Sequence, residues 1–343
     1  MRGQTLGLRI VPVLLAAYLL LGTSAVQPQA MAPDAALSAL WEQPHDLRDQ
    51  DLFNGPWGAA RAPDPDAVYT FLRLKTTGTN PGVVVQDPAG REWHVKQAPH
   101  NDHGEEGPVE VTVSRVLSAV GYHQPPVYFL PSFMMRDASG TRQVPGGRFR
   151  LHDGTMHSRG PWLWQRNPFI GTRPFQGLLV ILLAFNSFDL KSSNNSVYDV
   201  RLANGRTEQW YVVRDLGAAL GESARLGPTR NDPGRFERQT FITGIRDGFV
   251  TFSYHGWHPE LFRGRIVPAD LEWAATLLSG LSDRQWDDAF RAGGFTPAVA
   301  ASSGTSSAIW ERRSARALGS GPPGTIRGGS NARPSSPESA TVS

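Results

Sequence analysis

Two short segments of the chain carry side chains that suit the transfer of a phosphoryl group. Asp189, Lys191 and Asn194 follow an apolar run in the order Asp-x-Lys-x-x-Asn, and Asp215-Leu-Gly217 comes after two further strand-like segments. Asp189 is placed to orient and deprotonate an attacking hydroxyl group, and Lys191 to lie near the transferring phosphoryl group. Asn194 and Asp215 offer oxygen atoms, the ligands that Mg²⁺ prefers.

Three further candidate features lie in the first half of the chain. Lys96 ends an expected strand, and Glu110 lies in the first turns of the helix that follows. Gly78 and Gly82 lie in the turn-rich link between the first two strands. Taken alone, Lys96 reads as a surface lysine and Glu110 as a favourable charge at a helix start.

The elements that must position these residues follow from periodicity. Period-2 alternation and turn residues predict strands in the first half, and an apolar face closed by Gly121 predicts one helix opening at Pro108. The expected strands there are 68–75, 82–86, 92–97 and 127–130. The second half is expected to hold helices at 173–185, 268–281 and 283–292, with short strands at 197–200 and 210–213. This change from a strand-rich first half to a helix-rich second half predicts an α+β fold in two unequal lobes.

In these residues the chain resembles the protein-kinase superfamily over about residues 65–295. Asp189-Leu-Lys-Ser-Ser-Asn194 is similar to the kinase catalytic loop, and Asp215-Leu-Gly217 to the metal-binding Asp-Phe-Gly element with Leu in place of Phe. Lys96, Glu110 and the Gly78–Gly82 link resemble the strand lysine, its glutamate partner and the phosphate-covering loop.

The resemblance is closer to atypical, secretory or HipA-like kinases than to the eukaryotic regulatory type. Asn186-Ser-Phe-Asp189 stands where His-Arg-Asp is usual, and the chain has neither Gly-x-Gly-x-x-Gly nor an Ala-Pro-Glu after Asp215. These departures put activation-loop regulation and peptide-substrate recognition in doubt. They remove no catalytic group.

The resemblance implies a small N-lobe made of an antiparallel sheet with one helix, and a larger, mainly helical C-lobe. It implies ATP and Mg²⁺, or Mn²⁺, bound between the lobes, with Lys96, Glu110, Gly78 and Gly82 on the nucleotide. The implied activity is phosphoryl transfer to an unknown hydroxyl acceptor on a protein, a lipid or a small molecule. The alternatives are an inactive, pseudokinase-like binding or scaffold protein and a nucleotidyl (AMP) transferase.

Composition narrows the partners. The chain has 34 basic and 31 acidic residues among 343, a surplus of +3, and no basic block, so nucleic acid is not expected as a partner. It has no cysteine, which excludes disulfides, thiolate metal sites and a cysteine nucleophile.

The ends of the chain predict its location and its boundaries. Arg2 and Arg9 precede the apolar run 10–21 and the small residues 22–25, the pattern of a secretory signal peptide. The run is shorter than the roughly 20 residues of a spanning helix. We therefore expect export to the periplasm or the extracellular space, with an uncleaved membrane anchor as the alternative. The expected organisation is a signal peptide at 1–25, a linker at 26–60, an N-lobe at 61–135, a C-lobe at 136–315 and a disordered tail at 316–343.

Other candidate sites are weaker. His100, His103, Glu105 and Glu106 cluster in sequence and His255-Gly-Trp-His258 offers a second pair, but their Gly- and Asp-rich neighbours favour solvated loops over metal sites. No P-loop and no Gly-x-Ser-x-Gly elbow is present. The tryptophans are expected mostly in the core, with a substrate groove as the alternative for Trp162 and Trp164.

Overall fold

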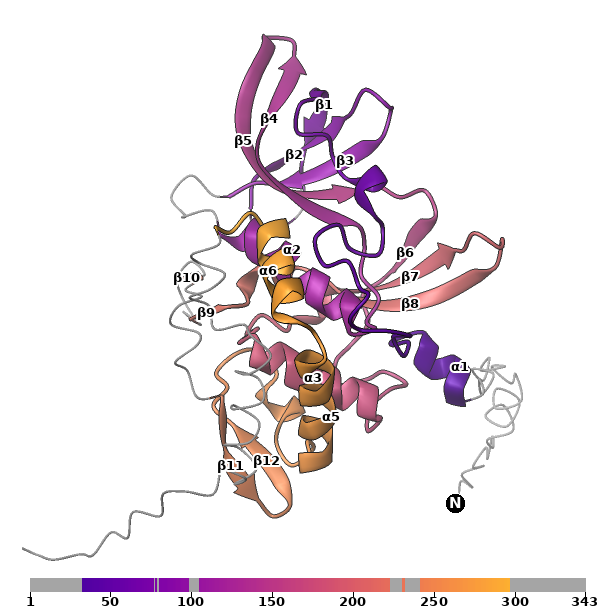
Figure 1. The fold of residues 1–343 in the computed structure, drawn as a ribbon, viewed down its shortest axis with the longest axis vertical. Coiled ribbons are helices and arrows are strands. Elements are labelled where there is room, and N and C mark those ends of the chain that lie inside the picture. The colour runs from indigo at the N-terminus through magenta and orange to yellow at the C-terminus, as the bar shows by residue number, and fades with distance from the viewer. Residues whose placement is uncertain are drawn as a thin grey trace, which may run out of the picture.

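The computed structural model describes residues 33–76, 78, 80–98, 105–222, 230–231 and 241–296. The expected signal peptide at 1–25 and the expected tail at 316–343 lie outside these residues. In the described part of the chain, no helix has both the length and the apolar character that crossing a membrane requires. The architecture is mixed α+β, as the sequence predicts (Figure 1).

Five strands close into a barrel at one end of the molecule (Figure 1). They are β1 (Val68–Leu74), β2 (Gly82–Gln86), β3 (Glu92–Lys96), β4 (Val127–Asp137) and β5 (Gly140–Leu151). The order around the barrel is β1-β2-β3-β5-β4, with β1 and β4 parallel and the other neighbours antiparallel. Because side chains alternate along a strand, Tyr69, Trp93 and Phe149 point inward and form the hydrophobic cluster of the barrel, against which Trp57 and Ala62 also pack.

The barrel extends beyond the boundary at 135 that the sequence predicts. β5 follows β4 directly and completes the ring, pairing with β4 from Val127↔Arg150 to Asp137↔Gly140. Pro and Gly weaken a strand signal, and β5 contains Pro145, Gly146 and Gly147. These glycines are required, because a Cβ at Gly146 would lie 1.8 Å from the Leu130 carbonyl oxygen and one at Gly147 2.1 Å from that of Lys96.

A larger body below the barrel holds the second, larger hydrophobic cluster (Figure 1). Its helices are α2 (Glu106–Ala119), α3 (Arg173–Ala184), α5 (Pro268–Ser279) and α6 (Asp283–Ala292). The tryptophans Trp162 and Trp164 are buried in this cluster, at 4% and 0% exposure, so they are core residues, and Trp164 also borders a small cavity of about 40 Å³. Gly177 on α3 lets α5 approach, since a Cβ there would lie 2.1 Å from the Trp273 ring.

The larger body contains more strand than the mainly helical lobe that the sequence predicts. The expected strands at 197–200 and 210–213 are confirmed as parts of β7 (Asn195–Arg201) and β8 (Thr207–Val213). They form a three-stranded sheet with β6 (Met156–Gly160). Two further sheets have two strands each: β9 (Gly221–Glu222) pairs with β10 (Arg230–Asn231), and β11 (Ile242–Arg246) pairs with β12 (Phe249–Phe252). Such short strands carry too few residues for a clear alternating pattern. Short helices complete the body: α1 (Pro33–Ser38), η2 (Ser192–Asn194), η3 (Leu216–Ala218) and η4 (Pro259–Leu261). Another short helix, η1 (Ala59–Arg61), lies against the barrel, where the Arg91 guanidinium donates to the Ala60 carbonyl oxygen at 3.1 Å.

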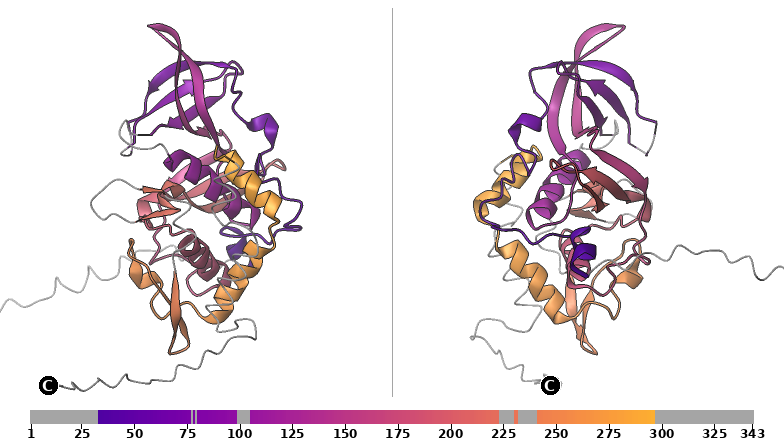
Figure 2. Two further views of the ribbon diagram at one scale, coloured as in Figure 1. Left: turned by 60° about the vertical axis from the view of Figure 1, so that its left-hand side comes forward. Right: turned by 90° about the vertical axis from the view of Figure 1, so that its right-hand side faces the viewer.

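Helix α2 belongs to the larger body and reaches the barrel with one end. The apolar face that the sequence predicts is fully buried, but its residues belong to the cluster of the larger body and pack with α6 and η3 (Figure 2). The first turn reaches the barrel, where a Cβ on Gly107 would lie 3.2 Å from the Arg148 backbone nitrogen. The helix therefore carries its first acidic residues to the junction between barrel and body.

The segment that the sequence predicts as a linker is, from about residue 39, part of the packed domain. Leu40 and Leu52 are each 1% exposed and belong to the larger cluster. The Trp41 indole Nε1 donates to the Val120 carbonyl oxygen at 2.7 Å. Burial lowers the pKa of Arg115 on α2 to about 10, and its guanidinium stacks 4.8 Å from the Trp57 ring centroid. The apolar residues that anchor this segment are too widely spaced to show a helical or strand period.

The β2–β3 turn gives a prediction about acid stability. Asp87 is 5% exposed and accepts hydrogen bonds from the Trp93 indole Nε1 at 3.0 Å and from the Arg91 backbone nitrogen at 2.8 Å. Burial raises the pKa of Asp87, but the combined effect of these hydrogen bonds and the Arg91 guanidinium is larger, so the net pKa lies below the ordinary value of 3.8. We expect Asp87→Asn to reduce the free energy of unfolding by about 1–3 kcal/mol at neutral pH, since charge-assisted bonds are lost.

The sign of the shift sets the pH range of this effect. A carboxyl whose folded pKa is depressed stabilises the protein fully above its unfolded pKa and loses that contribution as pH falls through the folded pKa. Denaturation at pH 7, 5 and 3 should therefore show a constant gap between wild type and Asp87→Asn down to about pH 5, closing below about pH 4. A gap that stays unchanged at pH 3 would contradict the assignment.

Candidate active site

One face of the barrel sheet is polar and turned away from the barrel core. On β3, Trp93 and Val95 point inward, so His94 and Lys96 lie on the other face. The register pairs Lys96 with Arg148 and His94 with Arg150 on β5. A stripe of cationic and imidazole side chains therefore runs across two neighbouring strands.

Lys96 lies at the centre of a carboxylate cluster. Its Nζ is 3.5 Å from Glu110 Oε2, 3.3 Å from Glu106 Oε2 and 3.7 Å from Asp215 Oδ1. Burial lowers the pKa of Lys96, but the combined effect of the carboxylates of Glu110, Asp215 and Glu106 is larger and raises it, so the net shift is upward. The structure thus brings together Lys96, Glu110 and Asp215, three residues that the sequence assigns to one site from three separate segments.

Arg148 is a member of this cluster that the sequence analysis missed. It is 3% exposed, its Nε lies 2.9 Å from Glu110 Oε1, and its Nη2 lies 4.0 Å from Asp215 Oδ1. Glu110 is therefore shared between Lys96 and Arg148. The alternation of Arg148, Phe149 and Arg150 could have indicated a strand with both arginines on its polar face. This alternation was overlooked because no strand was predicted there.

Asp215 is held at the junction by its backbone. It adopts the left-handed conformation, with φ 52° and ψ 48°, immediately before η3. A Cβ on Gly217 would lie 2.6 Å from the Glu106 carbonyl oxygen, so this glycine permits close contact with the start of α2. Burial raises the pKa of Asp215, but the combined effect of four cations is larger, so the net pKa is lowered and the carboxylate stays ionised. The cations are Lys96, Arg148, Arg150 and Arg214.

The Asp189–Asn194 loop forms a second cluster. Asp189 Oδ1 lies 2.8 Å from Lys191 Nζ, and the Asn194 side-chain nitrogen donates to Asp189 Oδ2 at 3.2 Å and to its carbonyl oxygen at 2.8 Å. The loop follows α3, whose buried residues anchor it. Lys191 Nζ also lies 5.4 Å from the ring centroid of Trp257, a residue that is 53% exposed.

The β7–β8 hairpin links the two clusters. Asn195 pairs with Val213, and the Arg214 backbone nitrogen donates to the Asn194 carbonyl oxygen at 2.9 Å. The backbone of Asn194 is therefore next to the residue that precedes Asp215. The two oxygen-bearing side chains that the sequence assigns to a metal are carried at the same end of one hairpin.

Gly78 and Gly82 lie where the first two strands meet this face. Gly82 pairs directly with Lys96, and a Cβ there would lie 2.2 Å from the Val95 carbonyl oxygen. Gly78 has φ 80°, and its neighbours at 77 and 79 lie outside the described residues. Lys75, which the sequence analysis missed, donates from Nζ to the Asn80 carbonyl oxygen at 2.8 Å. Burial, with Lys96 and Arg148 nearby, lowers the pKa of Lys75.

The charges of the site favour a polyanion. Five cations interact there with three carboxylates, which leaves a surplus of two positive charges. The cations are Lys75, Lys96, Arg148, Arg150 and Arg214, and the carboxylates are Glu106, Glu110 and Asp215. A ligand with several phosphates matches this surplus.

Two cavities adjoin the polar face. One of about 190 Å³ is lined by Lys96 and Glu106, between the start of α2 and the glycines of β5. The other, of about 320 Å³, lies between the barrel and the β6–β7–β8 sheet, with His94, Arg150 and Tyr198 in its lining. Both are open to solutes in the described part of the molecule.

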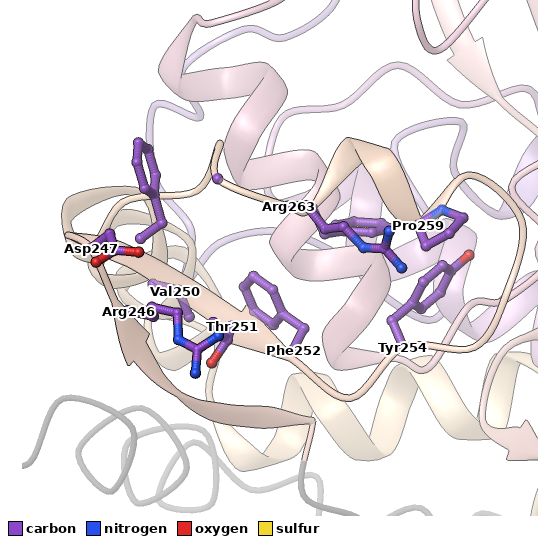
Figure 3. Close-up of a pocket in the computed structure, with 11 residues that line it drawn as sticks. Arg246, Asp247, Val250, Thr251, Phe252, Tyr254, Pro259 and Arg263 are labelled. Atoms are coloured by element: carbon purple, nitrogen blue, oxygen red, sulfur yellow. The ribbon is translucent and has the colours of Figure 1, made fainter.

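A third cavity, of about 430 Å³, lies against the β11–β12 hairpin and contains none of the predicted site residues. Figure 3 shows Phe252, Tyr254 and Arg263 around it. The Tyr254 hydroxyl oxygen lies 2.8 Å from the Trp257 carbonyl oxygen and 3.1 Å from that of Phe188, the residue before Asp189. Tyr254, in the lining of this cavity, therefore holds the backbone next to the Asp189 loop.

The weaker metal candidates of the sequence have no such environment. His100 and His103 lie outside the described residues. His258 Nδ1 lies 2.9 Å from Glu260 Oε1, which makes a two-residue contact. Among the residues that the structure describes, the group of three metal-ligating side chains is a different one, Glu92, His94 and His152.

No protein-family model matches this chain, and no curated protein matches it significantly. Among solved structures, the crystal structure of a Helicobacter pylori proinflammatory kinase, CtkA, aligns with 74% of this chain and 98% of its own. The TM-score is 0.34 and the sequence identity 10%, and a similarity at that level carries no argument about this chain.

Proposed function

We propose that the protein is an ATP- and Mg²⁺-dependent phosphotransferase acting on a hydroxyl acceptor. The observation that carries the proposal is the convergence of Lys96, Glu110 and Asp215, from β3, α2 and the segment after β8, within ion-pair distance. These are three of the residues on which the kinase resemblance rests. The positive charge around them is complementary to the negative charge of a nucleoside triphosphate.

Asp215 and Asn194 are the residues that would hold the metal. A carboxylate and an amide oxygen form the donor set that Mg²⁺ prefers, and the β7–β8 hairpin carries both at one end. When bound, the ion neutralises phosphate charge. Lys96, oriented by Glu110 and Glu106, is placed to bind phosphate oxygens, with Arg148 and Lys75 adding positive potential.

Asp189 is the proposed base for the acceptor. The bond between the acceptor oxygen and the γ-phosphorus forms, the bond from that phosphorus to the β–γ bridging oxygen breaks, and ADP leaves. The acceptor proton passes to Asp189, whose carboxylate is oriented by Asn194 and Lys191. Lys191 carries the positive charge that balances the transferring group.

The first test is the thermal stability of the purified protein with ATP, with and without magnesium or manganese. A ligand that binds only the folded state raises the melting temperature by mass action. We expect ATP to raise the melting temperature, and the metal to increase that rise. No rise with either metal would overturn the nucleotide site. A rise without transfer of label from either α- or γ-labelled ATP would favour the binding-protein alternative, and transfer of the α-label would favour nucleotidyl transfer.

A matched pair of lysine variants tests the binding assignment. Lys96→Met removes the cation that Glu106, Glu110 and Asp215 share, and we expect about tenfold or greater weakening of Mg–ATP binding, since truncation of a buried charge pair costs about 2–5 kcal/mol. Lys75→Met removes the same charge from the edge of the site and should weaken binding less. Equal losses in titration calorimetry would show a general charge effect and count against a specific role of Lys96.

A further inference from the structure

Glu92, His94 and His152 form a compact group at the other end of the polar face. One ligand atom from each of the three lies within 4.8 Å of the other two. The proposed phosphotransfer chemistry uses none of these residues. We infer that they form a binding site for a divalent transition-metal ion, of which zinc(II) fits best.

The barrel strands bring the three side chains together. Glu92 and His94 are two residues apart on β3 and therefore share a face. Trp93 pairs with Leu151, and the His152 backbone nitrogen donates to the Glu92 carbonyl oxygen at 2.9 Å, which holds His152 next to Glu92. The site is thus built on paired backbone and not on a free loop.

The distances are close to those that a metal ion needs. His94 Nε2 lies 3.2 Å from Glu92 Oε1, and the rings of His94 and His152 have centroids 5.8 Å apart. Tetrahedral coordination at about 2.0–2.2 Å places ligand atoms about 3.3–3.6 Å apart. The His94–Glu92 pair, at 3.2 Å, is close to this separation, and His152 is exposed, so its ring has room to turn toward the ion.

The donor set selects the class of ion. Two imidazoles and one carboxylate suit zinc and its neighbours in the transition series, whereas Mg²⁺ and Ca²⁺ prefer oxygen ligands alone. The chain has no cysteine, so a softer thiolate site cannot compete for the ion.

The surroundings support an open catalytic or regulatory type of site. The Arg73 guanidinium contacts both carboxylate oxygens of Glu92, at 2.7 and 3.4 Å, and so orients the carboxylate as outer-shell partners of metal ligands do. His94 and His152 both line the cavity of about 320 Å³ between barrel and body. Three protein ligands leave a fourth position free, facing that cavity, for water or for an atom of a bound molecule.

The test uses the purified full-length protein, free of any histidine tag, with zinc(II) alone and without nucleotide. Calorimetry should give one zinc ion per chain, and cobalt(II) in its place should give the visible absorption of a low-symmetry site with nitrogen ligands. We expect His152→Ala and His94→Gln each to weaken binding about tenfold or more. His157→Ala is the matched control, because His157 is also exposed and lines the same cavity but lies outside the cluster.

Several results would overturn the inference. Wild type without a stoichiometric zinc site would do so, as would binding that survives both His152→Ala and His94→Gln. An equal loss in His157→Ala would move the site elsewhere. Because nucleotide is absent, failure here leaves the proposed phosphotransferase untouched. His152→Ala changes an exposed side chain, so its melting temperature without metal serves to show that the variant is folded.

Discussion

Replacing Asp215 with asparagine should remove the magnesium-dependent part of ATP binding while leaving metal-free ATP binding intact or stronger. The substitution keeps the size of the side chain but takes away the anionic oxygen ligand that the metal requires. It also removes a negative charge that lies 3.7 Å from Lys96 and 4.0 Å from Arg148. The positive surplus of the site therefore grows, and a polyphosphate without metal binds in a more favourable field.

The measurement is a pair of ATP titrations, with magnesium and with a chelator, on wild type and variant. In wild type we expect magnesium to tighten binding by about tenfold or more, each factor of ten being about 1.4 kcal/mol. In Asp215→Asn the two curves should coincide. Asp199→Asn is the control, since Asp199 is an aspartate of β7, in the same hairpin, that pairs with Arg159 and not with the cations of the site, so its loss should leave both curves as in wild type. A variant that keeps the full magnesium effect would refute the metal assignment.

Phe149→Ala should have the largest effect on stability, about 3–5 kcal/mol in the free energy of unfolding. Phe149 is fully buried in the barrel, and its ring centroid lies 5.1 Å from that of Phe133, 5.6 Å from Tyr69 and 6.0 Å from Trp93. Truncation leaves a cavity that rings on three sides cannot fill. Urea denaturation followed by tryptophan fluorescence measures the loss.

Leu74→Ala is the control for this prediction, because Leu74 is on β1 of the same barrel but is 66% exposed. It should change stability by less than about 0.5 kcal/mol. Phe149 also lies between Arg148 and Arg150, two arginines of the polar face. If Phe149→Ala were no less stable than Leu74→Ala, the barrel core would not be organised around this ring.

The sequence by itself determined the local elements and most of the candidate site. Strands at 82–86 and 92–97 and helices at 173–185 and 283–292 match the structure within a residue or two, because alternation and helical periodicity are properties of short segments. The candidate residues were found because Lys96, Asp189 and Asp215 stand on recognisable local motifs. Their assigned roles remain predictions.

Only the tertiary structure decided which other side chains share the site. Arg148 comes next to Lys96 and Asp215 because β3 pairs with β5, a strand far away in the sequence. Lys75 comes near them because its backbone nitrogen donates to the carbonyl oxygen of Gly82, the residue that pairs with Lys96. The same long-range pairing closes the barrel with β5 and sets His152 beside Glu92. The apolar face of α2 was visible in the sequence, but the core that it faces was not. Periodicity reports which residues are buried, whereas the partner depends on contacts that no local segment contains.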